Sequence, residues 1–436
     1  MTSLEIGFSG LAVLLVLMGL RVPIAVALGG VSSIGILIIT GSPRAMIGSL
    51  GSLPFDFTAH FTLSAIPMFL LMGAVIYHSG LTANLFTAAR LWLSGLPGGL
   101  AIATNFASAS FAAASGSSMA TAAAMGRLAL PEMLKYKYNP GLAAGVIAAS
   151  GTLGSLIPPS ILMVIYGIFT EQPISKLLVA GILPGLLTAF AYTVLIMVRC
   201  TLNPELAPKI EETVTWKERF QSLKGVWAIP VLAVSVIGSI YAGIATPTEA
   251  GAIGAFMAMV IAMLTGNGSF KVIAASVKEA LFSLSSIFFI AIGAVMLTRF
   301  LVLAGIPDYL VELMGVWSVD PMLLVIGSLI IFIILGMFLD PLGLMLVTIP
   351  ILLPLYEALD INLIWMGVLV IKYLEVGLLT PPVGLNAYVV KGVAGDSVSL
   401  VTIFKGISWF LLAEVFVIAL LIIFPEISLY LPNLMD

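Results

Sequence analysis

The sequence predicts an all-α polytopic membrane protein with two inverted repeats of about five spans each, two re-entrant hairpins and two broken helices. Composition gives the class: 61% of the 436 residues are hydrophobic and only 9% are charged, against about 25% charged residues in soluble domains. The breaks are two Pro-Pro pairs, Pro158-Pro159 and Pro381-Pro382, each inside a hydrophobic stretch. The repeats are indicated by short motifs that recur in the same order in both halves.

The two Pro-Pro pairs point to function as well as to fold. They lie in the segments 154–160, GSLIPPS, and 377–386, GLLTPPVGLN. Proline lacks the N–H and clashes with the preceding turn, so each pair breaks a helix. In hydrocarbon the freed backbone groups must find partners, so such breaks survive only inside protein or beside a water-filled cavity. A matched pair of broken membrane helices indicates the binding site of a secondary transporter.

Matching motifs at a nearly constant offset indicate an ancient duplication. The segment 19–23, GLRVP, matches 243–247, GIATP, and the Pro-Pro pairs follow in the same order. We therefore divide the chain into a first repeat at 1–200, a cytoplasmic connecting loop at 201–224 and a second repeat at 225–436.

A full crossing needs about 20 apolar residues, and stretches near this length fall into five spans in each repeat. An odd number of spans inverts the second repeat relative to the first. The predicted spans are 4–20, 22–41, 62–79, 141–170 (broken) and 177–199, then 226–242, 247–265, 280–302, 363–390 (broken) and 406–424.

Two further segments, 98–134 and 321–356, each suit two short helices around a polar or bent centre. The centres are 115–118, SGSS, and 340–343, DPLG. We interpret both as re-entrant hairpins, the first open to the cytoplasm and the second to the outside. Two full spans in place of each hairpin is the alternative. It keeps the number of crossings in each repeat odd, but it places small and polar residues in lipid.

The basic residues set the orientation. With the N-terminus outside, only Arg44 and Lys176 lie on the outer side, and Arg127, Arg299 and Lys372 lie within membrane segments. All other Lys and Arg residues then lie inside, as the positive-inside rule requires. Both termini are therefore predicted to be periplasmic. The segments 81–96, 215–224 and 268–280 are predicted to be interfacial amphipathic arms.

Oxygen-bearing side chains gather at the hairpin centres and the breaks. Hard cations such as sodium prefer oxygen ligands, and hairpin tips free backbone carbonyls. The sequence therefore predicts two pseudo-symmetric sodium sites. The first comprises Ser115, Gly116, Ser117, Ser118, Thr152 and Gly154, and the second comprises Asp340, Gly343, Thr380, Gly384 and Asn386. Interhelical packing and hydrogen bonding is the structural alternative for the serines.

Intramembrane charges are costly and functional by default. Asp340 is the leading candidate, because it sits at a predicted hairpin tip. Lys372 and Glu375 lie three residues apart on one helix face and are expected to form an ion pair. Arg127 and Arg299 could attract an anion or pack against neighbours, and Glu249 is expected to cap a helix start.

Helices that restart after the tips and breaks present free N–H groups near mid-membrane, which suits anions. Ser118, Ser160 and Gly384 are the candidate residues for a substrate carboxylate there. Glycines elsewhere, such as Gly10, are interpreted as helix packing.

Several classes of function are disfavoured. A net charge of −3 argues against nucleic-acid binding, and the single cysteine, Cys200, excludes a disulfide framework and a thiolate metal cage. His60 and His78 have no carboxylate cluster at metal-ligand spacing, and no nucleophile–base arrangement is evident. We therefore expect neither an enzyme nor a bound cofactor other than coupling sodium ions. A membrane-embedded enzyme or assembly scaffold would leave the paired breaks unexplained.

Four motifs in order, 115–118, 154–160, 246–250 (TPTEA) and 377–386, resemble the large membrane subunit of TRAP transporters, the DctM-like family, along the whole chain. The resemblance implies sodium-coupled uptake of an organic acid across the bacterial inner membrane by an elevator mechanism. C4-dicarboxylates and sialic acid are among the family's substrates. It also implies a soluble periplasmic binding protein and a separate small four-helix membrane subunit as partners. A stand-alone sodium–carboxylate symporter of related fold, without a binding protein, is the alternative.

Overall fold

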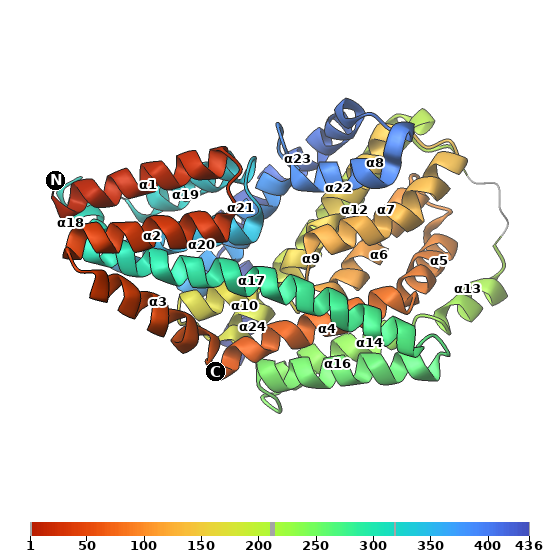
Figure 1. The fold of residues 1–436 in the computed structure, drawn as a ribbon. Coiled ribbons are helices and arrows are strands. Elements are labelled where there is room, and N and C mark those ends of the chain that lie inside the picture. Colours follow the sequence, from red (N-terminus) through yellow and green to blue (C-terminus); the bar gives the residue numbers. More distant parts are fainter. Residues whose placement is uncertain (1, 210–213, 318–319, 436) are drawn as a thin grey trace.

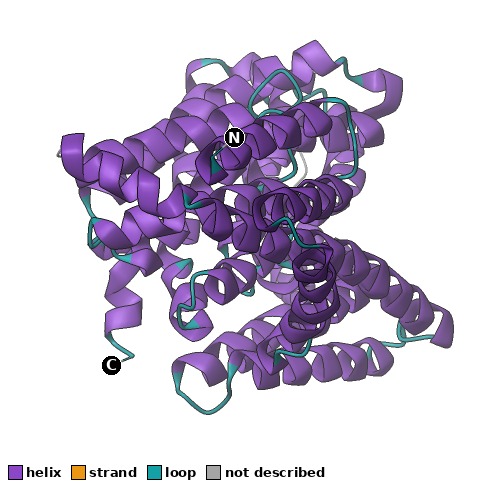
Figure 2. Cartoon of the chain, turned by 60° about the vertical axis from the view of Figure 1, so that its left-hand side comes forward, coloured by secondary structure: helices purple, strands orange, loops and turns teal. Residues whose placement is uncertain are grey.

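The computed structural model describes residues 2–209, 214–317 and 320–435, and these residues form helices and connecting turns without a strand (Figure 2). Residues 210–213, within the predicted connecting loop, lie outside the described part of the chain. The helices are α1 Ser3–Gly19, α2 Ile24–Thr40, α3 Pro43–Thr58, η1 Phe61–Ser64, α4 Ala65–His78, α5 Leu81–Leu93, α6 Gly99–Ser115, α7 Ser118–Lys135, α8 Pro140–Gly151, α9 Leu153–Leu156, α10 Ile161–Phe169, α11 Ile174–Ala180, α12 Ile182–Leu202, η2 Pro204–Leu206, α13 Trp216–Leu223, α14 Ala228–Ala233, η3 Val234–Gly238, α15 Ser239–Tyr241, α16 Pro247–Leu264, α17 Phe270–Ala304, α18 Ile306–Trp317, α19 Pro321–Gly336, α20 Pro341–Ala358, α21 Leu363–Leu379, α22 Leu385–Ala394, η4 Gly395–Ser397, α23 Leu400–Ile423 and α24 Glu426–Asn433.

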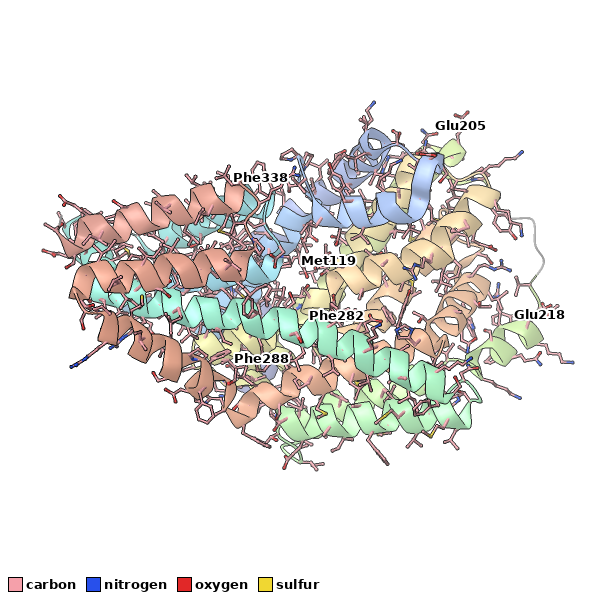
Figure 3. The ribbon with its side chains drawn as sticks, viewed as in Figure 1. Met119, Glu205, Glu218, Phe282, Phe288 and Phe338 are labelled. Carbon is pink, nitrogen blue, oxygen red and sulfur yellow. The ribbon has the colours of Figure 1, made fainter. Side chains whose placement is uncertain are left out.

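The all-helical membrane class predicted from composition is confirmed. In the described residues, seven helices are long and apolar enough to cross a membrane, or up to eight if the pair Pro140–Leu156 and Ile161–Phe169, bent by 43°, counts as one span. Large apolar side chains also point outward. Phe282 is 75% exposed and Phe338 is 60% exposed (Figure 3). Apolar surface on this scale suits contact with lipid.

Helices coincide with all ten predicted spans, and both Pro-Pro pairs fall between helices. The predicted hairpin segments each contain two helices, α6 and α7 in the first and α19 and α20 in the second. Of these four helices, only α20 is long and apolar enough by itself to cross a membrane. The alternative of two full spans in place of each hairpin would require this of all four helices. The re-entrant interpretation, the orientation and the division at 1–200 and 225–436 stay predictions.

The first halves of the broken helices are buried along almost their whole length. Every residue from Gly141 to Gly151 of α8 is buried, as is every residue from Trp365 to Leu379 of α21. Helices that are buried on every side are stable only when other helices surround them. α23 packs against both α8 and α21. The two segments that carry the breaks are thus fixed at the centre of one group of helices.

A second group of helices packs around α17, which runs along much of the molecule (Figure 1). α17 contacts α1, α2, α3 and α4, and α4 in turn packs on α16. The sequence predicted an arm at 268–280 followed by a separate span, but the structure has one continuous helix of 35 residues. No glycine or proline interrupts Phe270–Phe289, so the chain has no reason to break there.

The other two predicted arms form short helices that pack together. α5 covers most of 81–96, and α13 begins at Trp216 because Thr215 and Glu218 form a capping box. The Trp92 ring lies 6.3 Å from Trp216 and 5.6 Å from Phe220, centre to centre, and its indole N–H donates to the Arg219 carbonyl oxygen. Aromatic rings with a polar edge suit a membrane–water interface, as predicted for these arms.

Candidate functional site

The tip between α6 and α7 is a two-residue turn built by Gly116 and Ser117. Gly116 adopts φ +62°, a left-handed conformation that ends α6 and that glycine takes without strain. Ser117 is extended and begins α7, and its hydroxyl accepts from the Ala120 N–H at 3.4 Å. Thr121 braces the turn: its Oγ1 donates to the Ser117 carbonyl oxygen at 2.8 Å and lies 2.9 Å from the Ser115 hydroxyl. The turn therefore holds several oxygen atoms in a small space.

The first break follows α9, and the chain becomes helical again at α10. Ser160 is the N-cap of α10: its hydroxyl accepts from the Met163 N–H at 3.2 Å and donates to the Ser155 carbonyl oxygen. Thr152 donates to the Ala149 carbonyl oxygen at 2.6 Å, at the end of α8. The side chains at the break thus satisfy the backbone groups that the interruption frees.

The first tip packs directly against the first break. Ser118 Oγ lies 2.5 Å from Ser155 Oγ and donates to the Thr152 carbonyl oxygen at 3.3 Å. The two glycines permit this approach: a Cβ at Gly154 would lie 2.5 Å from the Ser117 carbonyl oxygen, and one at Gly116 would lie 2.3 Å from the Pro159 carbonyl oxygen. The structure therefore brings together the residues that the sequence predicted for the first sodium site.

The second set of predicted residues is more spread out. Asp340 is the N-cap of α20 and accepts from the Gly343 N–H at 2.9 Å. Thr380 ends α21, where its hydroxyl donates to the Val376 carbonyl oxygen at 2.6 Å, and Gly384 begins α22 with φ +56°. The described hydrogen bonds of Asp340 do not include one to Thr380. The helices that lead to this tip and break are in close contact at Gly336 and Gly377, where a Cβ on either would lie 3.0 Å or less from the other's Cα.

Asn386 lies beside the first half of the chain. Its side-chain nitrogen donates to the Ala148 carbonyl oxygen at 3.1 Å, four residues before Thr152. The side chain is fully buried, and its Oδ1 has no hydrogen-bond partner. α22 also packs on α7 and α8. Asn386 was grouped with Asp340 by sequence, but tertiary packing places it next to α8.

Two cavities border this central group. The smaller, about 390 Å³, is lined by Ser115 and Ser117 and by residues of α4 and α17. Arg127 lines it and donates to the Tyr77 hydroxyl, and His78 Nε2 lies 2.6 Å from Glu279 Oε2. Arginine lines both this cavity and the larger one, but only this cavity reaches the first tip, so it is the better candidate for an anion site.

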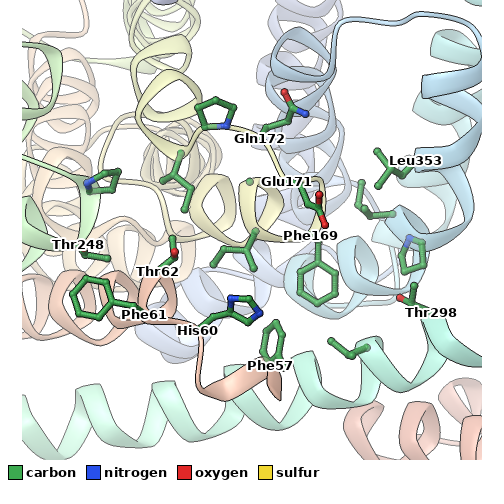
Figure 4. Close-up of a pocket in the computed structure, with 18 of the residues that line it drawn as sticks. Phe57, His60, Phe61, Thr62, Phe169, Glu171, Gln172, Thr248, Thr298 and Leu353 are labelled. Carbon is green, nitrogen blue, oxygen red and sulfur yellow. The ribbon is translucent and has the colours of Figure 1, made fainter. Parts of the chain in front are cut away.

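The larger cavity, about 1080 Å³, contains none of the tip residues. His60, Thr62, Phe169 and Glu171 surround it from several elements (Figure 4). Its wall includes Val295, Thr298 and Arg299 of α17, whereas Ala280 and Ser283 of the same helix line the smaller cavity. At 1.5 Å per residue, the two linings are about 18 Å apart along α17.

Several structural expectations for single residues are confirmed. Lys372 Nζ lies 3.1 Å from Glu375 Oε2, and Glu249 forms a capping box with Thr246. Sequence reasoning missed two residues that contact the first tip, Ser155 and Thr121. It also missed the residues around the Lys372–Glu375 pair, which are Glu414, Tyr192 and Thr188. Glu414 could have been found, because it is the only carboxylate in the apolar helix Leu400–Ile423 and such residues are functional by default.

Comparisons with known proteins agree on one family. A family model described as "Tripartite ATP-independent periplasmic transporter, DctM component" matches residues 11–427. The C4-dicarboxylate TRAP transporter large permease protein DctM of Pseudomonas aeruginosa is 35% identical over 392 residues, 89% of this chain and 90% of that protein. The sialic acid TRAP transporter large permease protein SiaM of Vibrio cholerae is 32% identical over 381 residues, 86% of this chain and 87% of that protein.

Among solved structures, the YdaH transporter of Alcanivorax borkumensis has a similar fold. The TM-score is 0.66, and the similarity covers 88% of this chain and 90% of that chain at 13% sequence identity. The likeness therefore concerns the fold alone.

Proposed function

Because the chain belongs to the DctM component family of tripartite ATP-independent periplasmic transporters, we propose that it is the large permease subunit of a sodium-coupled importer of an organic acid anion. Relatives are named for C4-dicarboxylate and for sialic acid, which supports a carboxylate substrate. As a multi-pass member of this family, it would reside in the bacterial inner membrane.

The observation that carries the sodium proposal is the packing of the first tip on the first break. Ser118, Ser155 and Thr152 present hydroxyl and carbonyl oxygens within hydrogen-bond distance of one another. Asn386 Oδ1 is a buried acceptor without a partner, on a helix that packs on α8. Buried polar groups are normally satisfied, so an oxygen-seeking cation such as sodium would complete this set.

The substrate carboxylate would bind in the 390 Å³ cavity, beside Ser115, Ser117 and Arg127. The N-terminus of α7 lies there, and N–H groups at a helix start favour anions. Ser118, Ser160 and Gly384 lie at helix starts outside the lining of this cavity, and they remain proposed contacts. By the predicted orientation this cavity opens toward the cytoplasm and the 1080 Å³ cavity toward the outside.

Both cavities share α17 as a wall, which supports an elevator mechanism. The helix group with the tips and breaks would slide along α17, so that the site faces one cavity and then the other. The spans around α17, with α5 and α13, would form the fixed scaffold.

Partner dependence tests the assignment as a tripartite permease. The purified chain would be reconstituted in liposomes alone, with a small four-helix membrane subunit, and with that subunit plus a periplasmic binding protein, using radiolabelled organic acids and a sodium gradient. We expect uptake only with both partners present. Equal uptake by the chain alone would contradict the proposal and would identify a stand-alone sodium–carboxylate symporter.

Asp340→Asn is expected to weaken the apparent affinity for sodium about tenfold, the equivalent of about 1.4 kcal/mol. Asparagine is as good an N-cap as aspartate, so α20 keeps its start while the half-buried site loses its charge. The measurement is initial uptake against sodium concentration in proteoliposomes.

The matched control for this variant is Asp320→Asn. Asp320 is also an N-cap, of α19, and accepts from the Met322 N–H at 2.7 Å, but it is exposed. We expect wild-type sodium dependence for it. An Asp340→Asn variant with unchanged sodium dependence would leave Asp340 as a helix cap only.

A further inference from the structure

A fully buried charged cluster joins α12, α21 and α23, away from both cavities. Lys372 Nζ lies 2.6 Å from Glu414 Oε2, 3.1 Å from Glu375 Oε2 and 3.2 Å from Thr188 Oγ1. The exposed fractions of the Lys372, Glu375 and Glu414 side chains are 0%, 1% and 0%. None of the three lines either cavity. The cluster holds three helices together around the segment that leads to the second break.

The charges in this cluster do not balance. One ammonium group faces two carboxylates. The Tyr192 hydroxyl, which donates to Glu414, and the Thr188 hydroxyl, which accepts from Lys372, are both neutral. An uncompensated buried charge costs several kcal/mol, and in practice a buried acid avoids this cost by taking up a proton. A second cation is therefore required if the helix group is to be stable.

Nearby charged groups do not supply that cation. Of the helices packed on α21, α10 and α20 contribute the hydroxyls of Tyr166 and Tyr356, which donate to the Leu363 carbonyl oxygen and to Ser328. Tyr373 of α21 donates to the Val325 carbonyl oxygen of α19. The remaining charged residues on these helices are in or near their terminal turns: Lys176, Glu357, Lys391, Lys405 and Glu426. On α12, which packs on α23, Arg199 lies in the last turn and its guanidinium group lies over the Trp409 ring, 4.3 Å from the ring centre. Lys405, on the same helix as Glu414, is about 13 Å from it along the axis.

We propose that this cluster binds one proton and that Glu375 carries it. Lys372 donates a hydrogen bond to Glu375 Oε2 and lies 2.6 Å from Glu414 Oε2 without hydrogen-bond geometry. Glu414 is still the better-stabilised anion, because the ammonium group lies closer to it and the Tyr192 hydroxyl donates to its Oε1. Glu375 has only Lys372 as a donor, and its Oε1 has no hydrogen-bond partner. With Glu375 neutral, Lys372 and Glu414 form a balanced pair. The cluster shares no residue with the proposed sodium sites and carries no substrate.

Infrared spectroscopy of the purified full chain at pH 7 tests for the proton. We expect a carbonyl stretch of a protonated carboxyl group that is lost in Glu375→Gln and retained in the control Glu357→Gln, whose side chain is exposed on α20. A wild-type spectrum that does not change in Glu375→Gln would overturn the proposal, since a bound metal cation would leave the carboxyl ionised.

Thermal melting gives a second measurement that does not depend on the spectrum. Glutamine has nearly the shape of a protonated glutamate, so Glu375→Gln should melt within about 2 °C of wild type. Lys372→Met leaves Glu414 without its cation and should lower the melting temperature by more than about 5 °C. The double variant Lys372→Met/Glu414→Gln removes both charges and should recover most of this loss. If Glu375→Gln destabilises as much as Lys372→Met, Glu375 is an anion and the proposal fails.

Discussion

Replacing Gly154 or Gly116 by alanine is expected to reduce uptake about 10- to 100-fold, which corresponds to the ~1–3 kcal/mol cost of overpacking a close contact. At Gly154 the new methyl group would meet the Ser117 backbone at 2.5 Å, and at Gly116 it would meet the Pro159 carbonyl oxygen at 2.3 Å. Backbone cannot rotate away as a side chain can. The tip would therefore separate from the break, and the oxygen atoms of the proposed sodium site would no longer converge.

Two controls separate loss of the site from loss of packing. Gly29 in α2 has no atom within 4 Å of an added Cβ, so Gly29→Ala should transport as wild type. Gly10 was interpreted by sequence as packing, and the structure places the Phe300 ring 2.7 Å from its added Cβ. Gly10→Ala should therefore lower the melting temperature yet keep sodium-dependent uptake. If uptake falls as far in Gly10→Ala as in Gly154→Ala, the loss comes from disturbed helix packing in both variants, and the proposed site is wrong.

Removal of sodium is expected to reduce uptake to the background of empty liposomes. The proposed coupling ions complete two groups of oxygen ligands, one at each tip and break, and without them these oxygen atoms, the Asp340 carboxylate included, would lie uncompensated within the membrane. Rates would be measured with choline in place of sodium at constant ionic strength. With sodium restored, the dependence should have a Hill coefficient above one, because more than one ion is bound.

A proton gradient provides the contrast for this experiment. We expect no uptake when an inward proton gradient is applied in sodium-free buffer, because the proposed proton at Glu375 lies away from both cavities. Undiminished uptake under these conditions would contradict sodium coupling. A Hill coefficient of one with full sodium dependence would reduce the proposal to a single ion site.

Local chemistry explains most of the agreement between sequence and structure. Thr246 with Glu249, Ser117, Asp340 and Ser160 begin helices as their capping preferences predict. Local signals failed where they were weak. α3 (Pro43–Thr58) was not predicted as a helix, although Ser42-Pro43 is a typical helix start, because its apolar residues lack a continuous stretch. α18 (Ile306–Trp317) was missed for the same reason.

By itself the sequence determined the membrane class, the positions of the breaks and caps, and the family, since these depend on composition and on neighbours along the chain. Only the tertiary structure decided which distant groups meet. It placed Asn386 against Ala148 and not beside Asp340, and it brought Glu414 to Lys372. Such pairings depend on how helices cross and on which faces are buried, and many helix arrangements satisfy the same hydrophobic pattern. Buried polar groups select among them, because each needs a partner that only one arrangement supplies.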